Sequence, residues 1–160
     1  MDWNLNYKHL RAGVVVDTNL FLLMLVGRHD LSKLKSFRAT AKYDPDIYKL
    51  LESLVAKFRS VHVTSNIMTE VDNLSRQTPR TEWPHVSRTL LSICRTASEE
   101  YFRSEQLISS PGHADYGLTD CSIIELARRD VLVVTDDARL TARLERRRRG
   151  VINLSRYVGR

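Results

Sequence analysis

The sequence predicts an α/β fold in which a parallel sheet carries helices on both faces. Apolar runs typical of buried strands occur at residues 14–17, 61–63, 131–135 and 151–154, and segments with helical spacing separate them. Strands that alternate with helices favour parallel pairing, because each crossover helix packs back onto the sheet. No repeat or long linker divides the 160 residues, so we expect one domain spanning residues 1–160.

Caps and apolar periodicity define the expected helices. In chain order these cover about 18–27, 45–58, 65–74, 85–103, 120–129 and 137–149. Asp17 or Thr18 can cap the first of them, and Thr64 or Ser65 can cap the third. The polar segments 28–44, 76–84, 109–112 and 113–117 are predicted to be loops or turns, with a short helix as the alternative for 28–44.

The composition is that of a globular protein and not of a membrane protein. A hydrophobic content of 42% and a charged content of 28% are typical of an ordinary globular domain. The longest apolar run, Leu20–Val26, is far shorter than the ~20 residues of a membrane helix. Residues 1–8 lack the apolar segment of a signal peptide, so we expect a cytoplasmic protein with no membrane association. Cys94 and Cys121 lie in apolar helical stretches and are expected to be buried, without a disulfide.

Four acidic positions share one setting. Asp17 and the pair Asp136-Asp137 close apolar strands, Asp120 opens a helix, and Glu70 lies in the helix after the second strand. Such positions converge on the crevice outside the carboxyl ends of a parallel sheet. Carboxylates gathered there repel one another unless a cation joins them, which favours a site for a hard divalent metal.

Each acid also has a simpler structural interpretation. Asp17, Asp120 and one of Asp136-Asp137 can act as helix caps. Glu70 lies on the apolar side of its helix, so it is expected to face the core or a cleft. An unpaired glutamate is costly to bury, so Glu70 must meet a cation or extend to the edge.

The charge of the chain is concentrated near its C-terminus. Residues 138–160 carry eight arginines and one acid, a net +7, whereas residues 1–137 carry 17 basic and 18 acidic residues, a net −1. Such a segment suits a polyanion, because neutralising phosphates releases counterions. A solvated helix face is the alternative interpretation. Leu140 and Leu144 are expected to face the core. The arginines expected to contact phosphates are Arg139, Arg143, Arg146 and Arg147.

Four motifs occur in a defined order. They are Val-Val-Val-Asp17-Thr18-Asn19, Thr64-x5-Glu70, Leu-Thr-Asp120 and Val-Val-Thr135-x-Asp137-x-x-Leu140. In this order the chain resembles the PIN-domain nucleases from residue 14 to about residue 154. The resemblance implies a three-layer α/β/α sandwich and a metal-dependent endoribonuclease.

The resemblance also implies which residues form the site. The catalytic acids that bind Mg²⁺ or Mn²⁺ would be Asp17, Glu70, Asp120 and Asp137, with Asp136 as an additional or alternative fourth ligand. Asn19 and Thr135 would support the first and fourth acids. In such families a metal-activated water attacks the phosphodiester, so no histidine base is required.

Partners follow from the same resemblance. Many PIN proteins of this size resemble VapC-type toxins, which implies an RNA substrate, a small antitoxin protein and a homodimer. An RNA-processing nuclease and an inactive RNA-binding or protein-binding PIN domain are the alternatives. A clustered negative cleft would repel phosphate in a pure RNA binder, which disfavours the inactive domain. A magnesium-dependent phosphatase or phospho-acceptor domain would require a lysine after a later strand, and no lysine follows Lys57.

Overall fold

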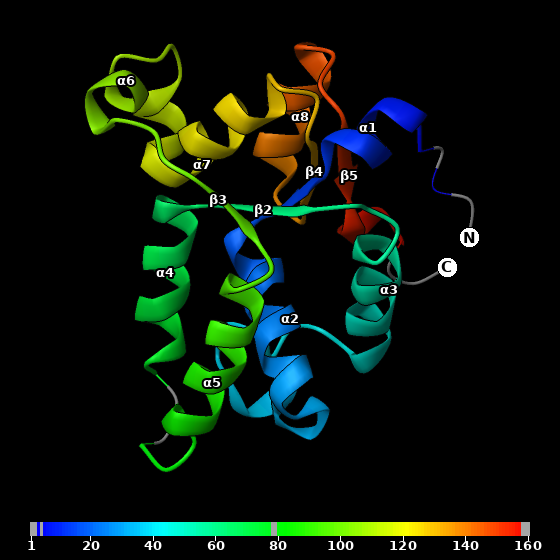
Figure 1. Ribbon diagram of the computed structural model, residues 1–160, viewed down its shortest axis with the longest axis vertical. Helices are drawn as coiled ribbons and strands as arrows, with labels where there is room; N and C mark the ends of the chain where they lie inside the picture. Colours follow the sequence, from blue (N-terminus) through cyan, green and yellow to red (C-terminus); the bar gives the residue numbers. More distant parts are fainter. Residues whose placement is uncertain (1–2, 4, 78–79, 158–160) are drawn as a thin grey trace.

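A five-stranded sheet forms the centre of the molecule (Figure 1). This computed structural model describes residues 3, 5–77 and 80–157. The strands are β1 (Val14–Val16), β2 (Val61–Thr64), β3 (Ser98–Glu100), β4 (Leu132–Thr135) and β5 (Val151–Asn153). All four pairings are parallel, in the order β3-β2-β1-β4-β5. The predicted parallel α/β fold is therefore confirmed.

Helices cover both faces of the sheet. They are α1 (Tyr7–Ala12), α2 (Thr18–His29), α3 (Pro45–Val55), α4 (Ser65–Ser75), α5 (Trp83–Cys94), α6 (Ser104–Ile108), α7 (His113–Ala127) and α8 (Ala138–Arg146). Two 3₁₀ helices, η1 (Leu31–Ser36) and η2 (Leu154–Tyr157), join them. Helices α2, α3, α4 and α5 lie on one face, and α7 and α8 lie on the other (Figure 1). The result is the three-layer α/β/α sandwich implied by the sequence.

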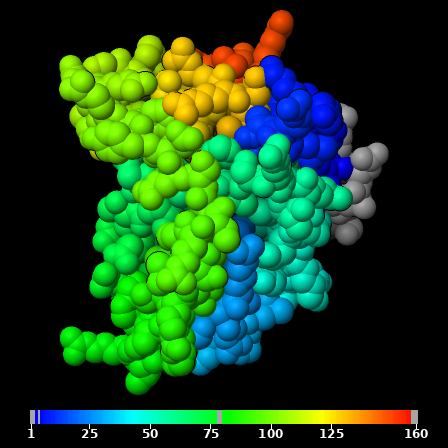
Figure 2. Space-filling model, viewed as in Figure 1, coloured from blue at the N-terminus to red at the C-terminus, as the bar shows by residue number. Residues whose placement is uncertain are grey.

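Helix α2 is the centre of one helical layer. Residues 20–27 are buried on all sides, because α3, α4 and α5 pack around this helix. Figure 2 shows the blue residues of α2 partly covered by the green residues of α5 and by those of α3. At Gly27 a Cβ would lie 2.3 Å from the Tyr48 ring, so only glycine allows α3 to approach this closely. Among the described helices, none is long and apolar enough to cross a membrane.

The predicted helix over residues 85–103 is wrong beyond Cys94. The chain leaves α5 there and forms β3, which pairs with β2 at one edge of the sheet. Ser98 and Glu99 are exposed, so this strand lacks the alternating apolar residues that reveal a half-buried strand. Cys94 is also exposed, contrary to expectation, whereas Cys121 is buried.

Two predicted loops contain helical turns. The segment 76–84, of which residues 78–79 lie outside the described part, ends in α5, where Pro84 occupies the first turn. Proline is tolerated there because the first N–H groups of a helix have no intrahelical partner. The segment 113–117 begins α7, which is kinked at Gly117 with φ +74°. That positive φ favours glycine and separates the first turn from the helix that carries Asp120.

The last helix is shorter than predicted. Helix α8 ends at Arg146 instead of residue 149, and Arg148 adopts a positive φ of 53° before β5 begins. The chain reverses direction within this short connection. Leu140 and Leu144 are fully buried, which confirms the predicted core-facing side of the helix.

Candidate functional site

Asp17 is a buried carboxylate held between two neighbouring strands. It follows β1, caps α2 and has a relative exposure of 7%. Its Oδ1 accepts a hydrogen bond from the Thr18 N–H at 2.7 Å, and its Oδ2 accepts one from the Thr135 hydroxyl at 2.6 Å. Thr135 ends β4, which pairs directly with β1. Both oxygens of Asp17 are therefore fixed by the ends of the two central strands.

Thr135 also links Asp17 to Asp137. Its hydroxyl oxygen accepts a hydrogen bond from the Asp137 N–H at 2.9 Å. Asp137 caps α8, where its Oδ1 accepts from the N–H groups of Arg139 and Leu140 at 2.6 and 2.9 Å. Both of these hydrogen bonds use Oδ1, and the side chain is exposed. Within the described residues, Asp137 Oδ2 has no hydrogen-bond partner. The supporting position predicted for Thr135 is present in the structure.

Glu70 reaches the same edge of the sheet from α4. The Thr18 hydroxyl donates a hydrogen bond to Glu70 Oε2 at 2.9 Å, so Thr18 connects Glu70 to Asp17. Glu70 itself is exposed. It therefore reaches the edge of the sheet and does not lie in the core.

Asp120 completes the acidic group from α7. Partial burial raises its pKa from an ordinary value of 3.8 to about 7, and the negative charges of Asp17, Asp137 and Glu70 add to this increase. The positive charge of Arg139 opposes it. The other three predicted acids therefore all lie within electrostatic reach of Asp120.

The pKa of Asp17 is raised as well. Burial is the largest cause, and the hydrogen bonds from Thr135 and Thr18 oppose it. The charges of Asp136 and Asp137 raise the pKa further. Burial and neighbouring negative charge therefore both favour the protonated form of Asp17.

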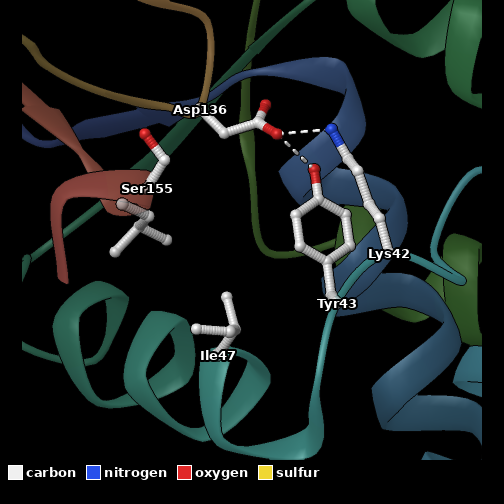
Figure 3. A pocket seen from close by; sticks show the side chains of 6 residues that line it. Lys42, Tyr43, Ile47, Asp136 and Ser155 are labelled. Atoms are coloured by element: carbon white, nitrogen blue, oxygen red, sulfur yellow. Dashed lines mark hydrogen bonds and ion pairs between the residues drawn. The ribbon is translucent and has the colours of Figure 1, made fainter. Parts of the chain in front are cut away.

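The side chains of Asp136 and Asp137 have different hydrogen-bond partners. Asp136 Oδ2 accepts a hydrogen bond from the Tyr43 hydroxyl at 2.8 Å and pairs with Lys42 Nζ at 2.5 Å (Figure 3). Burial and the charge of Asp136 raise the pKa of Tyr43. The charge of Asp137 raises the pKa of both Asp120 and Asp17, whereas that of Asp136 raises the pKa of Asp17 and Tyr43.

A cavity of about 340 Å³ adjoins Asp136. Its lining consists of Lys42, Tyr43, Ile47, Asp136, Leu154 and Ser155. In Figure 3 the Asp136 carboxylate points toward Lys42 and Tyr43, with Ile47 and Ser155 across the cavity. None of the four acids lines this cavity, although the charge of Asp17 contributes to the raised pKa of Tyr43.

The donor chemistry of the four acids suits a hard divalent cation. Carboxylate oxygens are preferred ligands of Mg²⁺ and Mn²⁺. Within the described residues, no three His, Cys, Asp or Glu side chains are grouped closely enough to hold a metal ion. Mg²⁺ usually keeps several waters and binds through one or two carboxylates together with substrate phosphates. An open acidic group of this kind fits that mode of binding.

Arg139 and Arg143 hold the turn that leads into α7. Arg139 Nη2 donates a hydrogen bond to the Asp115 carbonyl at 2.6 Å, and Arg143 Nη2 donates one to the Pro111 carbonyl. Both guanidinium groups lie over the Tyr116 ring, at 5.5 and 5.8 Å from its centroid. Arg139 is thus placed near the acids while part of its hydrogen-bonding capacity is already used.

Arg146 and Arg147 lie at the other end of α8. The helix has nine residues and spans about 13 Å at 1.5 Å per residue. Asp137 caps its first turn at the carboxyl edge of the sheet, so Arg146 and Arg147 lie at the amino edge. The structure therefore brings Arg139 to the acids and places Arg146 and Arg147 away from them. Asn19 is exposed on the first turn of α2.

Two residues of the site were missed in the sequence. Thr18 joins Asp17 to Glu70, and its position directly after Asp17 was the available signal. The Tyr116 ring contacts Arg139 and Arg143 of α8, but no sequence pattern marks it, because its position depends on the kink at Gly117.

Comparison of the chain with protein-family models, with curated proteins and with solved structures finds no match. The likeness to PIN-domain nucleases consequently depends on the four sequence motifs.

Proposed function

We propose that this chain is a divalent-metal-dependent endoribonuclease of the PIN type. The observation that carries the proposal is that Asp17, Glu70 and Asp137 lie close enough to Asp120 for their charges to add to the effect of burial, which together raise its pKa to about 7. Carboxylates brought together without a matching positive charge are unfavourable for folding. A functional cation, Mg²⁺ or Mn²⁺, would account for their arrangement.

The residues of the chain would divide the work of phosphodiester hydrolysis. Asp17 is fixed by Thr18 and Thr135 and would orient the cation. Asp137 Oδ2 is available for direct or water-mediated binding. Arg139, already close enough to influence Asp120, would attract the RNA phosphate. When bound, a divalent cation supplies charge neutralisation at the scissile phosphate and activation of the attacking water.

As the biological role we propose the toxin of a toxin–antitoxin pair, with a small antitoxin as partner and a homodimer as the assembled form. The resemblance to VapC-type toxins supports this role. An RNA-processing nuclease would use the same site. One observation favours an inactive binding domain as the second candidate: both oxygens of Asp17 are already engaged in hydrogen bonds.

Cleavage of total RNA by the purified protein tests the proposal. We expect cleavage with Mg²⁺ or Mn²⁺, none with EDTA, and none by Asp17→Asn. Asp46→Asn is the matched control, because Asp46 is an exposed acid at the start of α3, where only Lys49 pairs with it. Absence of cleavage under every divalent metal, or equal cleavage by Asp17→Asn, would contradict a nuclease. Growth arrest on expression of the parent, but not of Asp17→Asn, would support the toxin role.

A further inference from the structure

Basic residues precede all five strands. Arg95 precedes the edge strand β3, and the others precede the four strands whose beginnings lie around α1. Arg11 lies shortly before β1, Arg59 before β2, Arg129 before β4, and Arg148 and Arg149 before β5. Because all strands are parallel, their beginnings meet at the same edge of the sheet, opposite the four acids. Together with Lys8 of α1, these residues form what we call the amino-edge patch. Its members are Lys8, Arg11, Arg59, Arg129, Arg148 and Arg149.

Contacts with α1 hold this edge together. The Arg59 N–H donates to the Leu10 carbonyl at 3.4 Å, and His9 Nδ1 lies 2.8 Å from the Asp130 carbonyl oxygen. The His9 ring also packs against Gly150, where a Cβ would lie 2.4 Å from its Cε1 atom. Helix α1 therefore contacts the segments that precede β2, β4 and β5. In Figure 2 the blue residues of α1 lie beside the yellow-orange end of α7, and red-orange residues project above them.

Positive charge at this edge is only partly neutralised. Asp130 pairs with Lys8 at 2.8 Å, and Glu100 pairs with Arg129 at 2.7 Å. For Arg11, Arg59 and Arg148, the described structure contains no ion pair, and all three are exposed. Three arginines left without acidic partners on one edge are available to a polyanion.

A hollow with an exposed aromatic ring lies within the patch. It measures about 450 Å³ and is lined by Tyr7, Lys8, Arg11, Ala12, Arg129 and Asp130. The Tyr7 side chain is 73% exposed, and the Arg11 guanidinium lies 5.7 Å from its ring centroid. Single-stranded nucleic acids are held by this combination, since bases stack on aromatic rings while phosphates pair with nearby cations.

We propose that the amino-edge patch is a binding site for single-stranded RNA, separate from the acidic group at the opposite edge. The phosphates would contact Arg11, Arg59 and Arg148, and a base would stack on Tyr7. A lipid surface fits less well, because the other large hydrophobic side chains exposed within the described residues lie in α5, directly after β3 and in α6, at Leu91, Tyr101 and Ile108. Binding at the patch does not require cleavage.

Fluorescence anisotropy with a labelled oligouridine, in EDTA, measures this binding without hydrolysis. The test variant Arg11→Gln/Arg148→Gln removes two positive charges from the patch. The control Arg80→Gln/Arg88→Gln removes two exposed charges, one shortly before α5 and one within it. Two lost phosphate contacts should reduce the slope of log K against log salt by about 1.4, and the control should leave that slope unchanged. Tyr7→Ala should raise Kd about 5-fold or more without changing the slope.

Equal binding by the parent and the Arg11→Gln/Arg148→Gln variant would overturn the proposal, as would an equal loss in the control. Preferential binding of anionic phosphatidylserine vesicles over oligouridine would assign the patch to a membrane surface instead. Circular dichroism confirms that each variant is folded. Asp17→Asn should bind oligouridine with the salt slope of the parent, so a failure of the nuclease proposal and a failure of this one give different results.

Discussion

Replacing Asp120 by Asn should stabilise the metal-free protein at neutral and alkaline pH. The ordinary pKa of 3.8 and the folded pKa of about 7 differ by an amount that corresponds to about 4 kcal/mol, at about 1.4 kcal/mol per pH unit. Asp120 is partly exposed, and solvent screening reduces the expected effect to about 2 kcal/mol. Asparagine keeps the size of the side chain and removes its charge.

The sign follows from proton binding. Between about pH 4 and pH 7 the folded protein keeps the Asp120 proton that the unfolded chain has lost. Stability from this group is therefore complete below about pH 4 and is lost as the pH rises through 7. Asparagine does not ionise, so Asp120→Asn keeps this stability as the pH rises. Its free energy of unfolding should exceed that of the parent by about 2 kcal/mol at pH 8.

Urea denaturation in EDTA, followed at pH 5 and pH 8, measures the difference. Asp115→Asn is the control, because Asp115 is an exposed acid on the same helix. A variant that is less stable than the parent at pH 8, or one with the same pH dependence, would refute the electrostatic reasoning. Mg²⁺ at ten times its Kd should stabilise the parent by about 1.4 kcal/mol. It should stabilise Asp120→Asn less.

Three further outcomes are expected from the packing. Leu144→Ala should lower the free energy of unfolding by about 2–5 kcal/mol in urea denaturation, because Leu144 is fully buried. Gly27→Ala should lower it by about 1–3 kcal/mol, because the added methyl group meets the Tyr48 ring, and Tyr48→Ala should relieve part of that loss. A thiol reagent should label Cys94 in the native protein and Cys121 only after unfolding, as peptide mapping would show. Labelling of Cys94 should accelerate at alkaline pH, since partial desolvation of the thiol and the charge of Glu99 raise its pKa.

The sequence revealed the parts of the fold that have strong apolar patterns. The runs that became β1, β2, β4 and β5 are apolar because those strands are covered on both faces. Strand β3 escaped prediction because hydrogen bonding to β2, not burial, defines it. The turn at residues 113–117 escaped because polar residues and a glycine are equally compatible with a loop and with a kinked helix.

The position of the acidic site was predictable from the topology of the sheet. Strand ends converge in a parallel sheet, so Asp17 and Asp137 meet wherever the strands are correctly assigned. The direction of Asp136 was not predictable, because it depends on Tyr43 and Lys42 from a segment without regular periodicity. The destination of Arg146 and Arg147 depends on the length of α8, which periodicity defines poorly at its end.

Strand β3 also affects how the molecule behaves at high concentration. It is a sheet edge only three residues long, and it carries Glu99 and Glu100. Any second chain that extended the sheet at this edge by pairing with its own β3 would bring carboxylates close to carboxylates. The acidic edge strand thus discourages self-association of the sheet, and replacing Glu99 with valine would remove part of that barrier to aggregation.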